Sequence, residues 1–121
     1  MNHRSAETLK EDRAISTDEA AVVTWMLLHA SVAGPLAHFK PTVNTLQVVG
    51  RCSCGCPSVD FEVNGRTPPA RPIADATGQT AEGTEVGVIL WGREDTITGL
   101  EFYERGAAIR AMPLVRTLRA W

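Results

Sequence analysis

The sequence predicts an α+β fold in which an N-terminal helix packs on a mainly antiparallel sheet of about five strands built from hairpins. Three observations predict it: helical periodicity over residues 17–33, alternation of apolar and polar residues from Asn44 onward, and turn residues between the alternating stretches. The 121 residues, 44% hydrophobic and 21% charged, suit one domain with a core of its own. We expect residues 16–121 to form this domain and residues 1–15 to form a polar arm.

The helix predicted over residues 17–33 has a start signal and a stop signal. Ser16 and Glu19 have the spacing of a capping box, in which each side chain bonds the backbone N–H of the other residue. Apolar side chains then recur at helical spacing, namely Val23, Met26, Leu27 and Ala30. Gly34 and Pro35 are typical of a helix end.

A first hairpin is predicted around the cysteines. Residues 58–63 alternate between apolar and polar side chains, and the loop before them suggests a register in which Cys52 pairs with Val59. In that register Cys52 and Cys54 face the core, because residues two apart on a strand share a face. Cys56 then lies out in the turn, where we expect it to be exposed.

A second hairpin is predicted from residues 84–91 and 96–104, next to a short edge strand over residues 73–77. Alternation of side chains along the paired strands places four large ones on the same face, namely Ile89, Trp91, Leu100 and Phe102. The opposite face is also apolar, so both faces must be covered. One helix covers only one of them, and we therefore expect a homodimer.

Charge and hydropathy exclude several classes of function. The net charge of −2 argues against a nucleic-acid-binding protein. The apolar run of residues 20–28 is far shorter than the roughly 20 residues that cross a bilayer, and the N-terminus has no apolar signal segment, so we expect a cytoplasmic protein. Acids concentrate in residues 75–104 and arginines in residues 105–119. The basic tail is predicted to cross the acidic sheet region, within one subunit or between two.

All three cysteines lie within residues 51–61, in the run Arg-Cys-Ser-Cys-Gly-Cys-Pro-Ser-Val-Asp-Phe. With the later runs Val-Gly-Val-Ile-Leu-Trp (86–91) and Thr-Gly-Leu-Glu-Phe-Tyr (98–103), this element resembles a group of small uncharacterised bacterial proteins. That group has an Arg-Cys-x-Cys-Gly-Cys-Pro element ahead of a strand and a later Leu-Glu-x-Tyr strand. The resemblance covers about residues 44–104, and it implies no activity because the group has no assigned function.

Cys52, Cys54 and Cys56, called here the cysteine cluster, suggest a metal site. Thiolates are preferred ligands of zinc and of Cu(I), and zinc also accepts three cysteines and one histidine. The fourth zinc ligand would be a residue of a second chain or one of His38, His29 and Asp60, of which we select His38. Against a zinc site, the chain lacks the second cysteine pair that structural zinc sites usually have.

A second chemical interpretation is thiol redox activity. Cys54 and Cys56, or Cys52 and Cys54, have neighbouring thiols that would close a reversible disulfide, with Arg51 favouring a thiolate. Against it, the pair does not sit at a helix N-terminus, and the spacing of one residue between the cysteines makes closure geometrically awkward.

The remaining interpretation is structural. Free cysteine behaves as a small buried hydrophobe, and Gly55 and Pro57 would only shape a tight turn. No catalytic motif accompanies the cluster: Ser53 and Ser58 lack a nucleophile-elbow context, and no glycine-rich phosphate loop is present. We therefore take a non-enzymatic binding or interaction protein as the first hypothesis, with metal binding and redox activity as alternatives.

Overall fold

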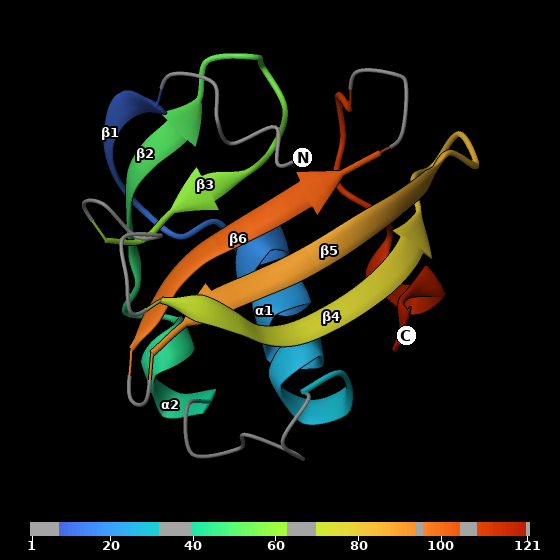
Figure 1. Cartoon of the computed structure of the whole chain (residues 1–121), viewed down its shortest axis with the longest axis horizontal. Coiled ribbons are helices and arrows are strands. Elements are labelled where there is room, and N and C mark those ends of the chain that lie inside the picture. Colours follow the sequence, from blue (N-terminus) through green and yellow to red (C-terminus); the bar gives the residue numbers. More distant parts are fainter. Residues whose placement is uncertain (1–7, 32–39, 63–69, 94–95, 105–108, 121) are drawn as a thin grey trace.

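A computed structural model of the chain describes residues 8–31, 40–62, 70–93, 96–104 and 109–120 (Figure 1). The elements in chain order are β1 (Thr8–Ala14), α1 (Thr17–His29), α2 (Lys40–Val43), β2 (Gln47–Cys52), β3 (Val59–Asp60), β4 (Arg71–Gln79), β5 (Glu85–Gly92), β6 (Ile97–Tyr103), the 3-10 helix η3 (Val115–Thr117) and β7 (Arg119–Ala120). The strands form one antiparallel sheet in the order β1-β2-β3-β6-β5-β4-β7. The α+β class with an antiparallel sheet is confirmed.

The sheet has seven strands rather than the expected five or so. β1 lies in the segment predicted to be an arm, and β7 lies in the tail. Neither has the apolar alternation of a central strand, because each pairs with only one neighbour at an edge of the sheet. The predicted edge strand over residues 73–77 is instead the nine-residue β4, which lies between β5 and β7.

The helix α1 begins as predicted and ends earlier. The Ser16 side chain accepts a hydrogen bond from the Glu19 backbone at 3.0 Å, and the Glu19 carboxylate accepts one from the Ser16 backbone at 2.9 Å. Arg13 adds two hydrogen bonds to the same carboxylate. The helix ends at His29 rather than residue 33, because the chain then joins the sheet: Ser31 forms an isolated bridge with Ala74.

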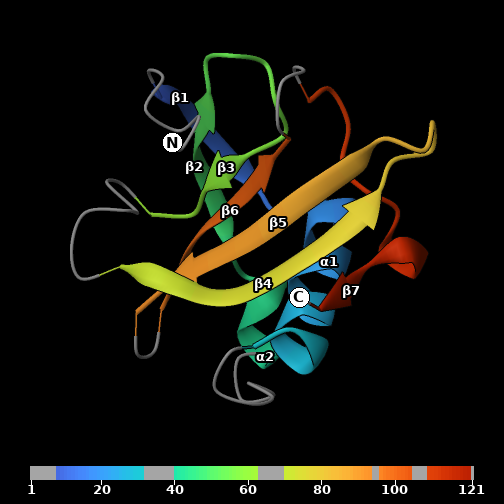
Figure 2. The ribbon, with the colours of Figure 1, turned by 45° about the vertical axis from the view of Figure 1, so that its right-hand side comes forward.

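α1 packs on one face of the sheet, behind β4, β5 and β6 in the view of Figure 1, and Figure 2 shows the same arrangement turned by 45°. The helix side chains Val23, Met26 and Leu27 are fully buried. The sheet contributes its own buried side chains to this core, chiefly Val86, Val88, Leu90, Leu100 and Phe102. Burying each large apolar side chain contributes about 1.5–3 kcal/mol, so this layer is the main source of stability.

The second hairpin forms where predicted, but the predicted pairing of its faces is wrong. Leu90 lies opposite Leu100 and Val88 lies opposite Phe102, whereas parity had placed Ile89 and Trp91 with that pair. The cause is a register shift next to the turn, where Trp91 pairs with Gly99 and Gly92 pairs with Ile97. The one extra residue is a bulge, and a shift of one residue exchanges the two faces of a strand.

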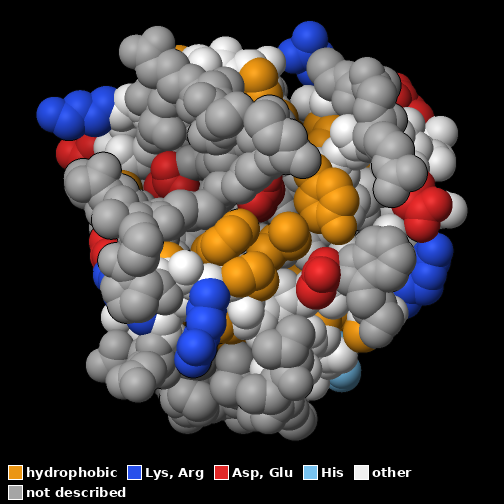
Figure 3. Space-filling model, viewed as in Figure 1, with side chains coloured by type: hydrophobic (Ala, Val, Ile, Leu, Met, Phe, Trp, Pro, Cys, Tyr) orange, Lys and Arg blue, Asp and Glu red, His pale blue; other side chains and the backbone are white. Residues whose placement is uncertain are grey.

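The face turned away from α1 carries a mixed surface. Figure 3 shows hydrophobic side chains gathered at its centre with acidic side chains beside them. Register places Ile89 and Trp91, both half-buried, on this face with Glu101. The Trp91 indole N–H donates to the buried Glu101 carboxylate at 2.9 Å. At the β7 edge, Arg119 pairs with Glu85 at 2.9 Å, so the basic tail meets the acidic region within one subunit.

The described helices are short. α1 has thirteen residues, and no helix in the described part of the chain has the length and apolar character needed to cross a membrane.

Candidate metal centre

The cysteine cluster begins at the last residue of β2 and continues into a tight turn. The strand ends at Cys52, and the backbone N–H of Gly55 donates to the Cys52 carbonyl at 3.3 Å. Gly55 has a φ of 88°, which an L side chain rarely adopts. A Cβ at this position would also lie 2.9 Å from Nη1 of Arg110. The backbone therefore favours glycine here, and any larger residue would also displace the Arg110 guanidinium.

The turn brings the three sulfur atoms together. All three lie within 4.8 Å of one another. The Cys52 thiol contacts Cys54 Sγ at 3.0 Å, and the Cys56 backbone N–H donates to Cys54 Sγ at 3.4 Å. The sulfur of Cys54 is therefore the centre of the group, and it accepts hydrogen bonds from both of the other cysteines.

The exposure of the cysteines differs from the prediction at two of the three positions. Cys52 is 1% exposed, as expected for a core-facing residue. Cys54 is exposed rather than core-facing, and Cys56 is 9% exposed and belongs to the core rather than to the solvent. The reason is that β2 ends at Cys52. Beyond a strand end, alternation no longer decides which way a side chain points.

The pairing of β2 with β3 is also one residue away from the predicted register. Arg51 lies opposite Val59, and Gly50 lies opposite Asp60, whereas Cys52 was expected opposite Val59. β3 has only two residues. The loop is therefore longer than a simple hairpin turn, which allows the Cys56 side chain to reach the core.

The environment separates the proton affinities of two thiols. Burial, together with the hydrogen bond to Cys54, raises the pKa of Cys52 to about 12. Burial acts to raise the pKa of Cys54 as well, but hydrogen bonds from the Cys52 and Cys56 thiols and from the Cys56 N–H outweigh it and lower that pKa. A first negative charge on this pair therefore resides on Cys54.

Arg110, from a distant part of the chain, borders the turn. Nη1 of Arg110 donates to the Cys54 carbonyl at 3.4 Å. Arg51, predicted to favour a thiolate, instead pairs with Glu11 at 2.6 Å. Its neighbour Cys52 points to the opposite face of β2. Sequence reasoning missed Arg110, because nothing but its place among the tail arginines distinguishes it.

The candidates for a fourth ligand do not join the cluster in the described part of the chain. Among the described residues, the group that could hold a metal contains the three cysteines alone. Asp60 lies in β3, between Gly50 of β2 and Gly99 of β6. His29 is at the end of α1, with its ring 5.0 Å from that of Trp25. His38 lies outside the described residues.

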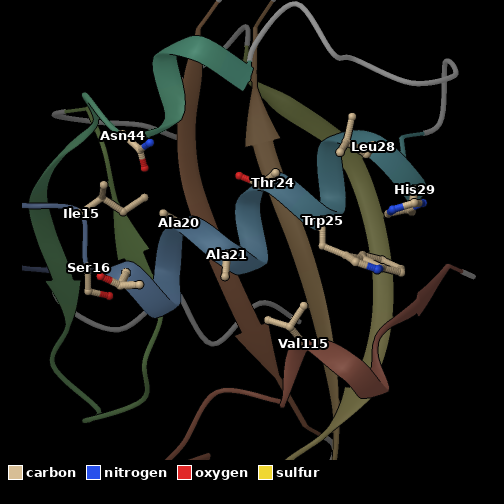
Figure 4. A pocket seen from close by; sticks show the side chains of 11 residues that line it. Ile15, Ser16, Ala20, Ala21, Thr24, Trp25, Leu28, His29, Asn44 and Val115 are labelled. Atoms are coloured by element: carbon tan, nitrogen blue, oxygen red, sulfur yellow. The ribbon is translucent and has the colours of Figure 1, made fainter.

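A separate hollow follows the outer side of α1 (Figure 4). Its volume is about 550 Å³, and it is bounded by α1, the segments next to it and η3. Trp25 and His29 line one end, and Leu28 and Val115 add apolar surface. None of the three cysteines lines this hollow, so it is distinct from the cluster.

Comparison of the chain with protein-family models, with curated proteins and with solved structures finds no match. The resemblance noted for residues 44–104 therefore stays a prediction. The homodimer and the cytoplasmic location also stay predictions.

Proposed function

We propose that this chain is a non-enzymatic metal-binding protein in which Cys52, Cys54 and Cys56 hold one thiophilic ion, Zn²⁺ or Cu(I). The observation that carries the proposal is the convergence of three sulfur atoms within 4.8 Å of one another. Three thiolates favour a soft ion over Mg²⁺ or Ca²⁺.

The sulfur positions need little adjustment to hold an ion. Zn–S bonds of about 2.3 Å in a tetrahedral site separate two sulfurs by about 3.8 Å. The Cys52 and Cys54 sulfurs lie 3.0 Å apart, so this pair would open by less than about 1 Å. Rotation of the exposed Cys54 side chain provides that opening without moving the core. Zinc would take a fourth ligand from water, His38 or a second chain, whereas Cu(I) is satisfied by three sulfurs.

A structural role is the second candidate, and the burial of Cys52 and Cys56 favours it. Both belong to the hydrophobic core, so they would be retained for packing alone. The two functions differ in what they require of Cys54. A packing role has no use for an exposed thiol, whereas a metal site needs all three sulfurs.

The experiment is metal analysis of the full chain purified without chelator and then loaded with Zn²⁺ or Cu(I) under reducing conditions. We expect one ion per chain and protection of all three thiols from alkylation. The Cys54→Ser variant is expected to lose the ion and keep its fold, because Cys54 is exposed. Ser53→Ala, in the same turn and also exposed, is the matched control and should bind as the wild type does.

Two results would contradict the metal proposal. One is a metal-free wild type after loading, with Cys54 freely alkylated. The other is a Cys54→Ser variant that retains one equivalent of metal. Either result, with Cys52 and Cys56 reacting only after denaturation, would favour the structural role.

A further inference from the structure

We propose that the cluster has a redox activity independent of metal: a hydroperoxide oxidises Cys54, and Cys52 then closes an intramolecular Cys52–Cys54 disulfide, while Cys56 stays reduced. The sequence left two redox pairs open, Cys54 with Cys56, which we had favoured, and Cys52 with Cys54. The choice of the second pair, and of a distinct role for each sulfur, comes from the geometry of the turn.

Exposure decides which sulfur reacts first. Cys54 is exposed, whereas Cys52 is 1% exposed and Cys56 is 9% exposed. A hydroperoxide arriving from solvent therefore reaches only Cys54 without local unfolding. The Cys56 backbone N–H, 3.4 Å from Cys54 Sγ, fixes the position of this sulfur in the turn. Solvent access is one of the properties on which susceptibility to oxidation depends.

The Cys52 sulfur is close enough to Cys54 to close the disulfide. Cys52 Sγ lies 3.0 Å from Cys54 Sγ, so the two atoms need to approach by about 1 Å to reach the roughly 2.0 Å of a disulfide bond. On an extended strand, residues two apart would be separated by roughly 6.6 Å between Cα atoms, near the upper limit for a disulfide. The turn closed by the Gly55 N–H to Cys52 carbonyl bond removes that obstacle.

Cys56 has a different role in this scheme. Its backbone N–H and its thiol both hydrogen-bond the Cys54 sulfur, and its side chain is part of the core. These contacts hold the Cys54 sulfur in place while the Cys56 thiol remains packed. Cys56 is therefore a positioning residue for the reaction.

The chemistry balances with a hydroperoxide as the only oxidant. The Cys54 thiolate attacks the O–O bond of ROOH, an S–O bond forms, and the departing alkoxide takes a proton to leave as ROH. Cys52 then attacks the Cys54 sulfur, the S–S bond forms, and the S–O bond breaks. The hydroxide released takes the proton from the Cys52 thiol and leaves as water. Two thiols and ROOH give one disulfide, ROH and water, with two electrons transferred to the peroxide.

The test uses the full chain, treated with chelator and a reductant and then freed of both. A few equivalents of hydrogen peroxide are added, and the remaining thiols are alkylated after denaturation. Trypsin cleaves after Arg51 and Arg66, so one peptide contains all three cysteines, and fragmentation of that peptide locates the label. We expect label on Cys56 alone and full recovery of three labelled cysteines after dithiothreitol.

Variants separate the roles of the three sulfurs. Cys54→Ser should lose the fast reaction, with at least a tenfold lower rate of thiol loss. Cys52→Ser should retain the first step and accumulate a Cys54 sulfenic acid that dimedone traps. Cys56→Ser should still lose two thiols, and Ser53→Ala should behave as the wild type does. If Cys52→Ser fails to fold, the location of the label in the wild type decides the question alone.

Several outcomes would overturn the inference: label on Cys52 or Cys54 instead of Cys56, three labelled cysteines after peroxide, or a disulfide between two chains. Each is independent of the metal proposal, because the protein carries no metal in this experiment. A chain that binds no metal but closes the Cys52–Cys54 disulfide would refute the proposed function and leave this inference standing. A chain that binds the metal but closes no Cys52–Cys54 disulfide would refute this inference and leave the proposed function standing.

Discussion

The α1–sheet core and the cysteine turn are both partly buried, but they are held together in different ways. The core packs α1 against a sheet face whose largest side chains are fully buried. The contacts that shape the turn include the Gly55 N–H to the Cys52 carbonyl, the Cys52 thiol and the Cys56 N–H to Cys54 Sγ, and Arg110 to the Cys54 carbonyl. The first region therefore dominates stability, and the second carries the chemistry through the exposed Cys54.

The largest effect on stability is expected from the core. Leu90 is fully buried, and Leu90→Ala should lower the free energy of unfolding by about 2–5 kcal/mol, because it removes apolar contacts and leaves a cavity. Denaturant unfolding measures this loss. The matched control is Leu28→Ala on the half-buried outer side of α1, which should cost clearly less. Equal losses for the two variants would show that the α1–sheet layer is not the main source of stability.

A smaller effect on stability, but a specific one on function, is expected at Gly55. Gly55→Ala should cost about 1–2 kcal/mol, because a left-handed φ is unfavourable for an L side chain. Gly83→Ala is a close control: its φ is 86°, and nothing lies within 4 Å of the added Cβ. Both variants should be destabilised, but only Gly55→Ala displaces Arg110 and should weaken metal binding and slow disulfide closure. Equal metal affinity in the two variants would contradict the importance of the turn geometry.

How much of the structure could be predicted from the sequence also differs between the α1–sheet core and the cysteine turn. The capping box of Ser16 and Glu19 was predictable because it is local, and the positions of β5 and β6 followed from alternation. The bulge beside Gly92 was not predictable, because no local residue signals it, and it exchanged the two faces of the hairpin. β1 was missed because an edge strand carries charges such as Lys10 and Glu11 in place of apolar alternation.

At the cysteine cluster, spacing alone predicted that three thiols would lie together. It did not predict their exposure, because β2 ends at Cys52 and the turn beyond it has no periodicity. It also did not predict Arg110, which lies 56 residues from Cys54 along the chain. Contacts of that separation depend on the whole fold, and a single sequence has no local signal for them.

The smallest expected effect concerns the pH dependence of metal binding, and it leaves the core unchanged. The pKa of Cys52 is about 12, so at neutral pH its thiol is protonated, and a bound metal must displace that proton. Metal affinity should therefore rise with pH, by at least about tenfold per pH unit between pH 6 and pH 8. Competition titrations with a chromophoric chelator measure this slope. A pH-independent affinity would show that Cys52 is not a ligand.

The central claim, that all three sulfurs hold one ion, is tested most directly by X-ray absorption at the metal edge of the loaded full chain. The account predicts three sulfur ligands per Zn²⁺ or Cu(I) in the wild type and in Ser53→Ala, with fewer sulfurs or no bound ion in Cys54→Ser. A wild-type spectrum with at most two sulfur ligands, or one unchanged by Cys54→Ser, would contradict it.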